Sequence, residues 1–176
     1  MRSKLFFLFL IFITSINAQT IYVNQNATGA NNGSSWADAY TNLEAALSQA
    51  SATKPIWVAA GTYIPSTTNA NPRKATFSVI NNTKLYGGFN GTETQLEDRN
   101  PKINITILSG DLNGDDNGNI VDTEATRQDN SYHVISIRGN SRNIVIDGFT
   151  ISGGNANGTT NNSCSTAAAS QFFDTR

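Results

Sequence analysis

Short β-branched segments, each closed by glycine or asparagine, recur along most of this chain and constrain its fold more than any other feature. Three of them are followed by the turn-rich stretches AAGTY, LSGDLNG and IDGFTISGGN. β-Branched residues favour extended backbone, and Gly and Asn reach positive φ at low cost, as tight turns require. The pattern predicts a strand-rich, all-β fold. The expected strands cover residues 21–24, 56–60, 75–80, 84–86, 105–108, 133–137 and 143–146.

The spacing of the turns indicates a repeating unit. Gly88 and Gly110 are 22 residues apart, about the length of one turn of a parallel β-helix. Gly110 and Gly148 are 38 residues apart, and the excess corresponds to an acidic insertion near residues 111–130. We therefore expect a solenoid of stacked parallel strands, in which asparagines of successive turns form amide ladders. An antiparallel β-sandwich is the alternative, but it predicts hairpins and stricter alternation than these continuously apolar runs show.

One segment has helical spacing. Residues 36–50 follow Ser34 and Ser35, either of which can cap a helix by accepting backbone N–H bonds. Its apolar positions recur at helical intervals. They are Ala39, Leu43, Ala46, Leu47 and Ala50. The sequence therefore predicts an amphipathic helix over residues 36–50.

The N-terminus resembles a secretory signal peptide. Arg2 and Lys4 precede an apolar run that ends at Ile13, and small or polar residues follow as far as Ala18. A retained membrane anchor would need roughly 20 apolar residues, more than this run supplies. We expect cleavage after residue 18 and a secreted or cell-surface protein, with no membrane span in the mature chain.

Composition excludes several function classes. The formal net charge is −1 and charged residues make up only 14% of the chain, so there is no basic surface for nucleic acid. Cys164 is the only cysteine, which excludes an internal disulfide. His133 is the only histidine, so a Cys/His metal cluster is excluded as well.

The order of motifs resembles a known family. IYVNQNATGANNGSSWADAYTNLEAALSQA is followed by IWVAAGTYIP, LYGGFNGTET, TILSGDLNGDD, NSYHVI and IDGFTISGGNA. This series is similar to the N-terminal part of secreted right-handed parallel β-helix repeat proteins with a pectin-lyase-like fold, of the type found on the surface of Bacteroidetes bacteria. The resemblance covers about residues 21–156. It implies a fold more specifically than an activity, because one fold carries many functions.

The resemblance also implies an organisation for the chain. Residues 19–54 would form a strand, a loop and a helix that covers the open end of the stack, where apolar core and an unpaired strand edge are otherwise exposed. Residues 55–158 would form the turns of the β-helix. Residues 159–176 depart from the family pattern, and we expect an irregular tail that truncates the stack after about three to four turns.

The acidic segment has the spacing of a calcium loop. Oxygen-bearing side chains occupy positions 1, 3, 5, 7, 9 and 12 of a twelve-residue stretch, as in an EF-hand. They are Asp111, Asn113, Asp115, Asn117, Asn119 and Asp122. Asp116 stands where the sharp turn calls for Gly, and position 12 is Asp rather than Glu. The spacing therefore permits one calcium ion as a cofactor but does not require it, and these departures favour a solvated loop whose Asp, Asn and Gly satisfy turn geometry.

No residue pattern indicates catalysis. Paired catalytic carboxylates need a groove and separated pKa values, whereas neighbouring loop aspartates are normally solvated. His133 is expected to be a packed, structural residue. Trp36 and Trp57 are expected to pack in the core or the cap, as such residues more often do. The alternative is a platform for a sugar ring, which can stack on an aromatic face.

These observations favour an exported, non-catalytic β-helix module of a bacterial surface or secreted protein. Its expected role is adhesion, carbohydrate binding or display, with an extracellular glycan or cell-surface component as partner. The alternative is the N-terminal fragment of a polysaccharide lyase or glycoside hydrolase whose catalytic turns are missing from this chain.

Overall fold

The computed structural model describes residues 19–66, 70–80, 82–137 and 143–158. The predicted signal peptide and the tail at residues 159–176 lie outside the described residues. The strands are β1 (Ile21–Val23), β2 (Ile56–Ala59), β3 (Gly61–Tyr63), β4 (Phe77–Val79), β5 (Lys84–Phe89), β6 (Thr106–Ser109), β7 (Ile135–Ile137), β8 (Val145–Asp147) and β9 (Thr150–Ser152). The helices are α1 (Leu43–Ser48) and three short 3-10 helices, η1 (Pro72–Lys74), η2 (Leu96–Asp98) and η3 (Ala125–Arg127).

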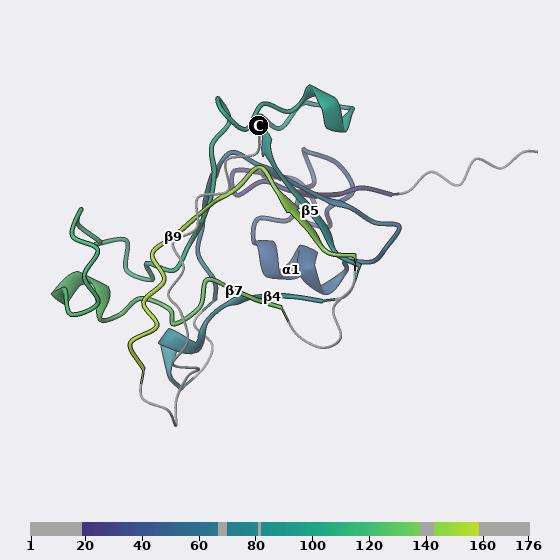
Figure 1. The fold of residues 1–176 in the computed structure, drawn as a ribbon. Coiled ribbons are helices and arrows are strands. Elements are labelled where there is room, and N and C mark those ends of the chain that lie inside the picture. Colours follow the sequence, from purple (N-terminus) through teal and green to yellow (C-terminus); the bar gives the residue numbers. More distant parts are fainter. Residues whose placement is uncertain (1–18, 67–69, 81, 138–142, 159–176) are drawn as a thin grey trace, which may run out of the picture.

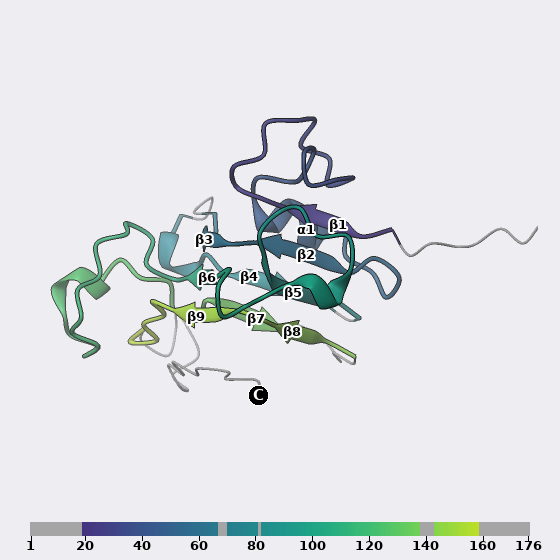
Figure 2. The same ribbon diagram turned by 90° about the horizontal axis from the view of Figure 1, so that it is seen from above.

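The described strands form three parallel sheets. Their orders are β1-β2-β5-β8, β3-β6-β9 and β4-β7, so that the chain visits the three sheets in turn from β2 onward. Figure 1 shows the sheets as three sides around a common interior, and Figure 2 shows successive strands of each sheet side by side. The antiparallel β-sandwich is wrong, because every pairing between these strands is parallel.

The predicted 22-residue period is also wrong. Gly88 belongs to β5 and Gly110 follows β6, which are consecutive strands in different sheets. The positions that do pair are much farther apart in sequence: Ile56 pairs with Leu85, and Gly61 pairs with Thr106. The connections differ in length, because the turns carry different loops. Sequence spacing alone therefore identifies the wrong partners.

The glycines that lie against one another belong to successive turns of the chain. A Cβ on Gly87 would lie 2.5 Å from the carbonyl oxygen of Gly148, and a Cβ on Gly110 would lie 2.8 Å from that of Gly153. These contacts are closer than real Cβ atoms allow, so the side chain must be absent for the backbones to approach.

The predicted helix is shorter than expected. It begins at Leu43, and its N-cap is Asn42, whose side chain accepts the N–H of Ala45 at 2.8 Å. Upstream, the backbone of Tyr40 exchanges two hydrogen bonds of 2.9 Å with Tyr22 and Asn24 at β1. The backbone before Asn42 therefore hydrogen-bonds to the edge strand β1 instead of extending the helix.

The core lies between the sheets and α1. Leu43, Ala46 and Leu47 of α1 are buried in the same cluster as β-strand residues such as Phe77 and Leu108, which are fully buried. α1 packs against β1 and β4. Truncating a fully buried leucine to alanine typically costs about 2–5 kcal/mol. None of the described helices has the length and apolar character that a membrane crossing requires.

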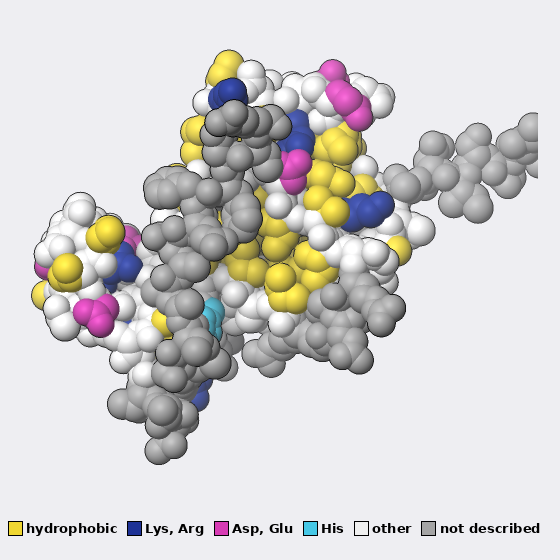
Figure 3. Space-filling view, viewed as in Figure 1, with side chains coloured by type: hydrophobic (Ala, Val, Ile, Leu, Met, Phe, Trp, Pro, Cys, Tyr) yellow, Lys and Arg dark blue, Asp and Glu magenta, His cyan; other side chains and the backbone are white. Residues whose placement is uncertain are grey.

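The last strands are less well covered than the first. Ile137 of β7 is 56% exposed and Val145 of β8 is 36% exposed. Ile135, Ile146 and Ile151 are only partly buried. Figure 3 shows hydrophobic side chains gathered at this end of the molecule. Each of β7, β8 and β9 ends the order of its sheet, so each has one neighbouring strand within the part of the chain that the structure describes.

Candidate functional site

The acidic segment lies between β6 and β7 and projects from the body of the molecule, as Figure 1 shows. Its carboxylates converge at one place. One oxygen each of Asp111, Asp115 and Asp129 lie within 4.8 Å of one another. Two of these residues belong to the predicted calcium ligands, and Asp129 does not.

Asp111 also organises the loop. Its Oδ1 accepts the backbone N–H of Gly114 at 2.7 Å and of Asp115 at 3.2 Å, and its Oδ2 accepts that of Asp116 at 3.0 Å. A carboxylate that accepts several N–H bonds fixes the turn around itself. Asp111 therefore brings Asp115 back toward its own side chain.

The remaining predicted ligands make other contacts. Asn113 donates its backbone N–H to Asp129 Oδ2 at 3.1 Å, which draws Asp129 toward the cluster. Asn117 and Asn119 donate their side-chain amides to Glu124. Asp122 offers its backbone carbonyl to the amides of Asn155 and Asn157, each at 3.1 Å. The twelve-residue spacing therefore does not describe the set of oxygens that the fold assembles.

A second carboxylate system lies beside the cluster. Asp116 Oδ2 accepts from Arg127 at 3.2 Å and from Asn130 at 2.9 Å, while its Oδ1 is buried without a protein partner among the described residues. Burial raises the pKa of Asp116, as do the charges of Asp111 and Asp129, against the opposing effect of Asn130 and Arg127. Arg127 also donates to the carbonyl of Gly154 at 2.7 Å, which ties the acidic segment to the chain that follows β9.

Asp147 has a partner that the sequence did not indicate. Arg99 binds its Oδ2 at 2.6 Å and donates to the carbonyl of Gly87 at 3.1 Å. His133 is half-buried between the buried residues Tyr132 and Val134.

The two tryptophans belong to one aromatic cluster with Tyr22 and Phe89. Trp57 is only 7% exposed and stacks on Phe89 with ring centroids 4.7 Å apart. Trp57 is therefore a core residue and offers no face to a ligand. Trp36 contacts Tyr22 edge-on at 4.8 Å and Phe89 at 5.5 Å, and its Nε1 donates to the carbonyl of Glu93 at 2.9 Å. These contacts fix the orientation of a half-buried ring.

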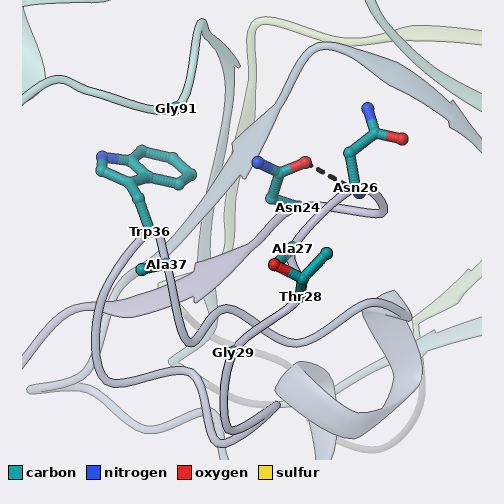
Figure 4. A pocket seen from close by; sticks show the side chains of 8 residues that line it. All are labelled: Asn24, Asn26, Ala27, Thr28, Gly29, Trp36, Ala37 and Gly91. Carbon is teal, nitrogen blue, oxygen red and sulfur yellow. Dashed lines mark hydrogen bonds between the residues drawn. The ribbon is translucent and has the colours of Figure 1, made fainter.

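Trp36 lines an open cavity of about 490 Å³. The other lining residues are Asn24, Asn26, Ala27, Thr28, Gly29, Ala37 and Gly91. Figure 4 shows the indole next to the amide of Asn24, with Asn26 beyond it and the indole nitrogen turned away from both. Asn24 Oδ1 accepts the backbone N–H of Asn26 at 3.0 Å, which holds the Asn24 amide in place.

Different elements supply the cavity. Asn24 directly follows β1, Asn26 to Gly29 form the loop after it, and Gly91 belongs to the turn after β5. The parallel pairing of β1, β2 and β5 places the ends of these strands at the same edge of the sheet. The sequence offered sugar stacking as one option for Trp36, with packing favoured, and it gave no sign of the polar neighbours, since Gly91 lies far along the chain.

Comparison of the chain with models of protein families, with curated proteins and with solved structures found no match. The resemblance to β-helix repeat proteins therefore stays a prediction.

Proposed function

We propose that this chain is an exported, non-catalytic module with a right-handed parallel β-helix fold, and that it binds an extracellular glycan at the cavity lined by Trp36. Export is supported by the pattern of residues 1–18, with Arg2 and Lys4 before an apolar run. The solenoid fold is supported by three parallel sheets that the chain visits in turn. The position of α1 against β1 supports a helix that covers the first turn.

The observation that carries the glycan proposal is the Trp36 cavity. Sugar rings present C–H faces that pack on an aromatic ring and hydroxyl groups that need hydrogen-bonding partners. Trp36 supplies a ring that Tyr22 and Phe89 hold in one orientation. Asn26 and Thr28 supply exposed polar groups beside it. A ring that is already oriented loses little conformational entropy on binding.

The size of the cavity suits a small saccharide. Ligand sites in proteins are commonly about 300–1,000 Å³, and this cavity is about 490 Å³. Because it is open to solvent, the sugar bound there can be part of a longer chain. The site therefore fits adhesion to a polysaccharide or to a glycan of a cell surface.

The proposal is tested by calorimetric titration of the mature chain with oligosaccharides, using Trp36→Ala and Thr28→Ala variants. We expect Trp36→Ala to abolish binding and Thr28→Ala to weaken it several-fold. Trp36 also packs on Tyr22 and Phe89, so its variant needs a check of folding by circular dichroism. Thr28 is exposed, and its replacement leaves the packing intact.

Thr94→Ala is the matched control, because Thr94 is an exposed threonine outside the cavity lining. It should bind as the unmodified chain does. Equal affinities for the Thr28→Ala and Thr94→Ala variants, together with retained binding in a folded Trp36→Ala variant, would exclude this cavity as the glycan site.

The acidic segment supports a second candidate function, the binding of one calcium ion. The observation in its favour is the convergence of Asp111, Asp115 and Asp129. Calcium prefers carboxylate and carbonyl oxygens at 2.3–2.6 Å and tolerates irregular geometry, which a loop can provide. Three carboxylates near one point also repel one another, and a divalent cation relieves that repulsion.

The rival proposal is a polysaccharide lyase or glycoside hydrolase, of which these residues form a non-catalytic part. It differs from the module in one testable respect, since it requires that a preparation of the whole protein cleaves the glycan that it binds. Incubation with the bound oligosaccharide, followed by chromatography of the products, separates the two. Intact oligosaccharide supports the module, and shortened products support the enzyme.

A further inference from the structure

The charge around the Trp36 cavity is unbalanced. None of the eight lining residues carries a charged side chain. Two carboxylates, however, lie next to the two glycines of the lining. A side chain on Gly29 would collide with Oδ1 of Asp38. The N–H of Gly91 donates to Oε2 of Glu93 at 3.0 Å.

Asp38 carries a negative charge at neutral pH. Its Oδ1 accepts the backbone N–H of Ala30 at 2.8 Å, and its Oδ2 lies 3.0 Å from the hydroxyl of Ser35. These two hydrogen bonds lower the pKa of Asp38. No lysine or arginine is in contact with it among the described ion pairs.

Glu93 is held in place by the turn that it organises. It is 8% exposed, and its two oxygens accept the N–H groups of Asn90, Gly91 and Thr92 at 2.6 to 3.0 Å. Its own carbonyl accepts the indole N–H of Trp36. The carboxylate therefore cannot turn away from Gly91 without breaking these three hydrogen bonds.

We infer that the Trp36 cavity selects uncharged sugars and discriminates against uronic acids. A uronate bound there would add its carboxylate to a site whose lining glycines contact the acids Asp38 and Glu93 and whose lining holds no cationic side chain to compensate. Like charges repel, and a carboxylate that the cavity partly covers also loses some hydration free energy. A neutral sugar has neither cost and can use the amides of Asn24 and Asn26.

This inference rests on the proposed glycan function and makes it more specific. It also bears on the alternative that these residues are part of a polysaccharide lyase, because a site that rejects uronates does not serve an enzyme that acts on polyuronates. The repulsion acts on the carboxylate of the sugar, so the cavity should discriminate against monomeric and polymeric uronates alike.

The experiment compares sugars that differ only at C6. Mannotetraose and tetramannuronate, both β-1,4-linked, form one matched pair, and the β-1,4-linked glucose and glucuronate tetramers form another. Each is titrated calorimetrically into the mature chain at low and at high ionic strength. We expect at least one neutral member to bind, with its uronate about 10-fold weaker at low salt and a smaller gap at high salt, because salt screens the repulsion.

Asp38→Asn tests the cause of the selection. Asparagine keeps an oxygen for the N–H of Ala30 but removes the charge, so the affinity of the uronate relative to its neutral partner should rise. A uronate that binds as well as or better than its neutral partner would overturn the inference and leave the glycan function standing. A folded chain that binds neither member of either pair would overturn both. A gap that persists unchanged in Asp38→Asn and at high salt would assign the selection to shape and overturn the electrostatic account.

Discussion

The side-chain amide of Asn143 donates to Oδ1 of Asn82 across 3.4 Å, and both residues adopt positive φ, of 56° and 62°. Each stands two residues before a strand position, and those positions, Val145 and Lys84, pair in register. The two asparagines are therefore equivalent residues of successive turns. The pair makes one contact of the kind that an amide ladder would repeat.

Replacing Asn82 separates the backbone from the side-chain contribution. Asn82→Ala should lower the free energy of unfolding by about 1–2 kcal/mol, because alanine disfavours the left-handed conformation. Asn82→Gly should lower it by less, since glycine adopts that conformation freely. Urea denaturation of both variants measures the difference. Equal losses would show that the amide contact, and not the backbone, is what Asn82 contributes.

Strand positions were predicted better than the way they stack. The apolar run at residues 105–108 became β6, within one residue at each end. β3 was missed, because it has three residues and begins at Gly61, which has a φ of 148°. The period failed because the loops between strands differ in length. Only the pairing of the sheets identifies which glycines are equivalent.

Variants of two aspartates in the acidic segment test the proposed calcium site. Asp129→Asn should abolish any rise in melting temperature caused by millimolar calcium, because it removes one of three converging carboxylates. Asp122→Asn is the control, since Asp122 contributes its backbone carbonyl to the loop and its carboxylate is outside the cluster. Differential scanning calorimetry with calcium and with chelator provides the measurement. A melting temperature that calcium leaves unchanged in the unmodified chain would contradict the site.

The raised pKa of Asp116 leads us to expect that the free energy of unfolding depends on pH. Burial raises the pKa of its carboxyl in the folded state, so the folded chain binds the proton more tightly than the unfolded chain does. Stability is then favoured at low pH and falls as pH rises through the unfolded pKa toward the folded one. Asp116→Asn keeps an oxygen for Arg127 and Asn130 and cannot ionise. It should therefore be more stable than the unmodified chain at neutral pH, with the advantage vanishing at pH values below 3.8, the ordinary pKa of an aspartate.

Denaturant midpoints of both proteins between pH 3 and pH 8 measure this effect. An advantage of Asp116→Asn that stays constant across the range would contradict the titration of Asp116. Loss of stability at neutral pH would show that the ion pair with Arg127 outweighs the cost of burying the charge.

The candidate sites were only partly accessible from the sequence. Asp111 and Asp115 follow the spacing of a calcium loop, but Asp129 joins them through the N–H of Asn113, a contact that no spacing rule describes. The sequence alone did not distinguish the role of Trp36 from that of Trp57. Their roles differ because Trp57 lies within β2 and stacks on Phe89, while Trp36 follows a loop at the end of β1.

The central claim, that the Trp36 cavity binds a glycan, is tested most directly by nuclear magnetic resonance. The chain has two tryptophans, so its spectrum contains two indole N–H signals. During titration with a neutral oligosaccharide, the account predicts saturable shifts of the Trp36 indole signal and of the backbone amides of Asn26, Thr28 and Gly91. The indole of Trp57, buried against Phe89, serves as the internal reference and should move little. Shifts confined to other parts of the molecule, or none with any of the neutral tetrasaccharides at millimolar concentration, would contradict the account.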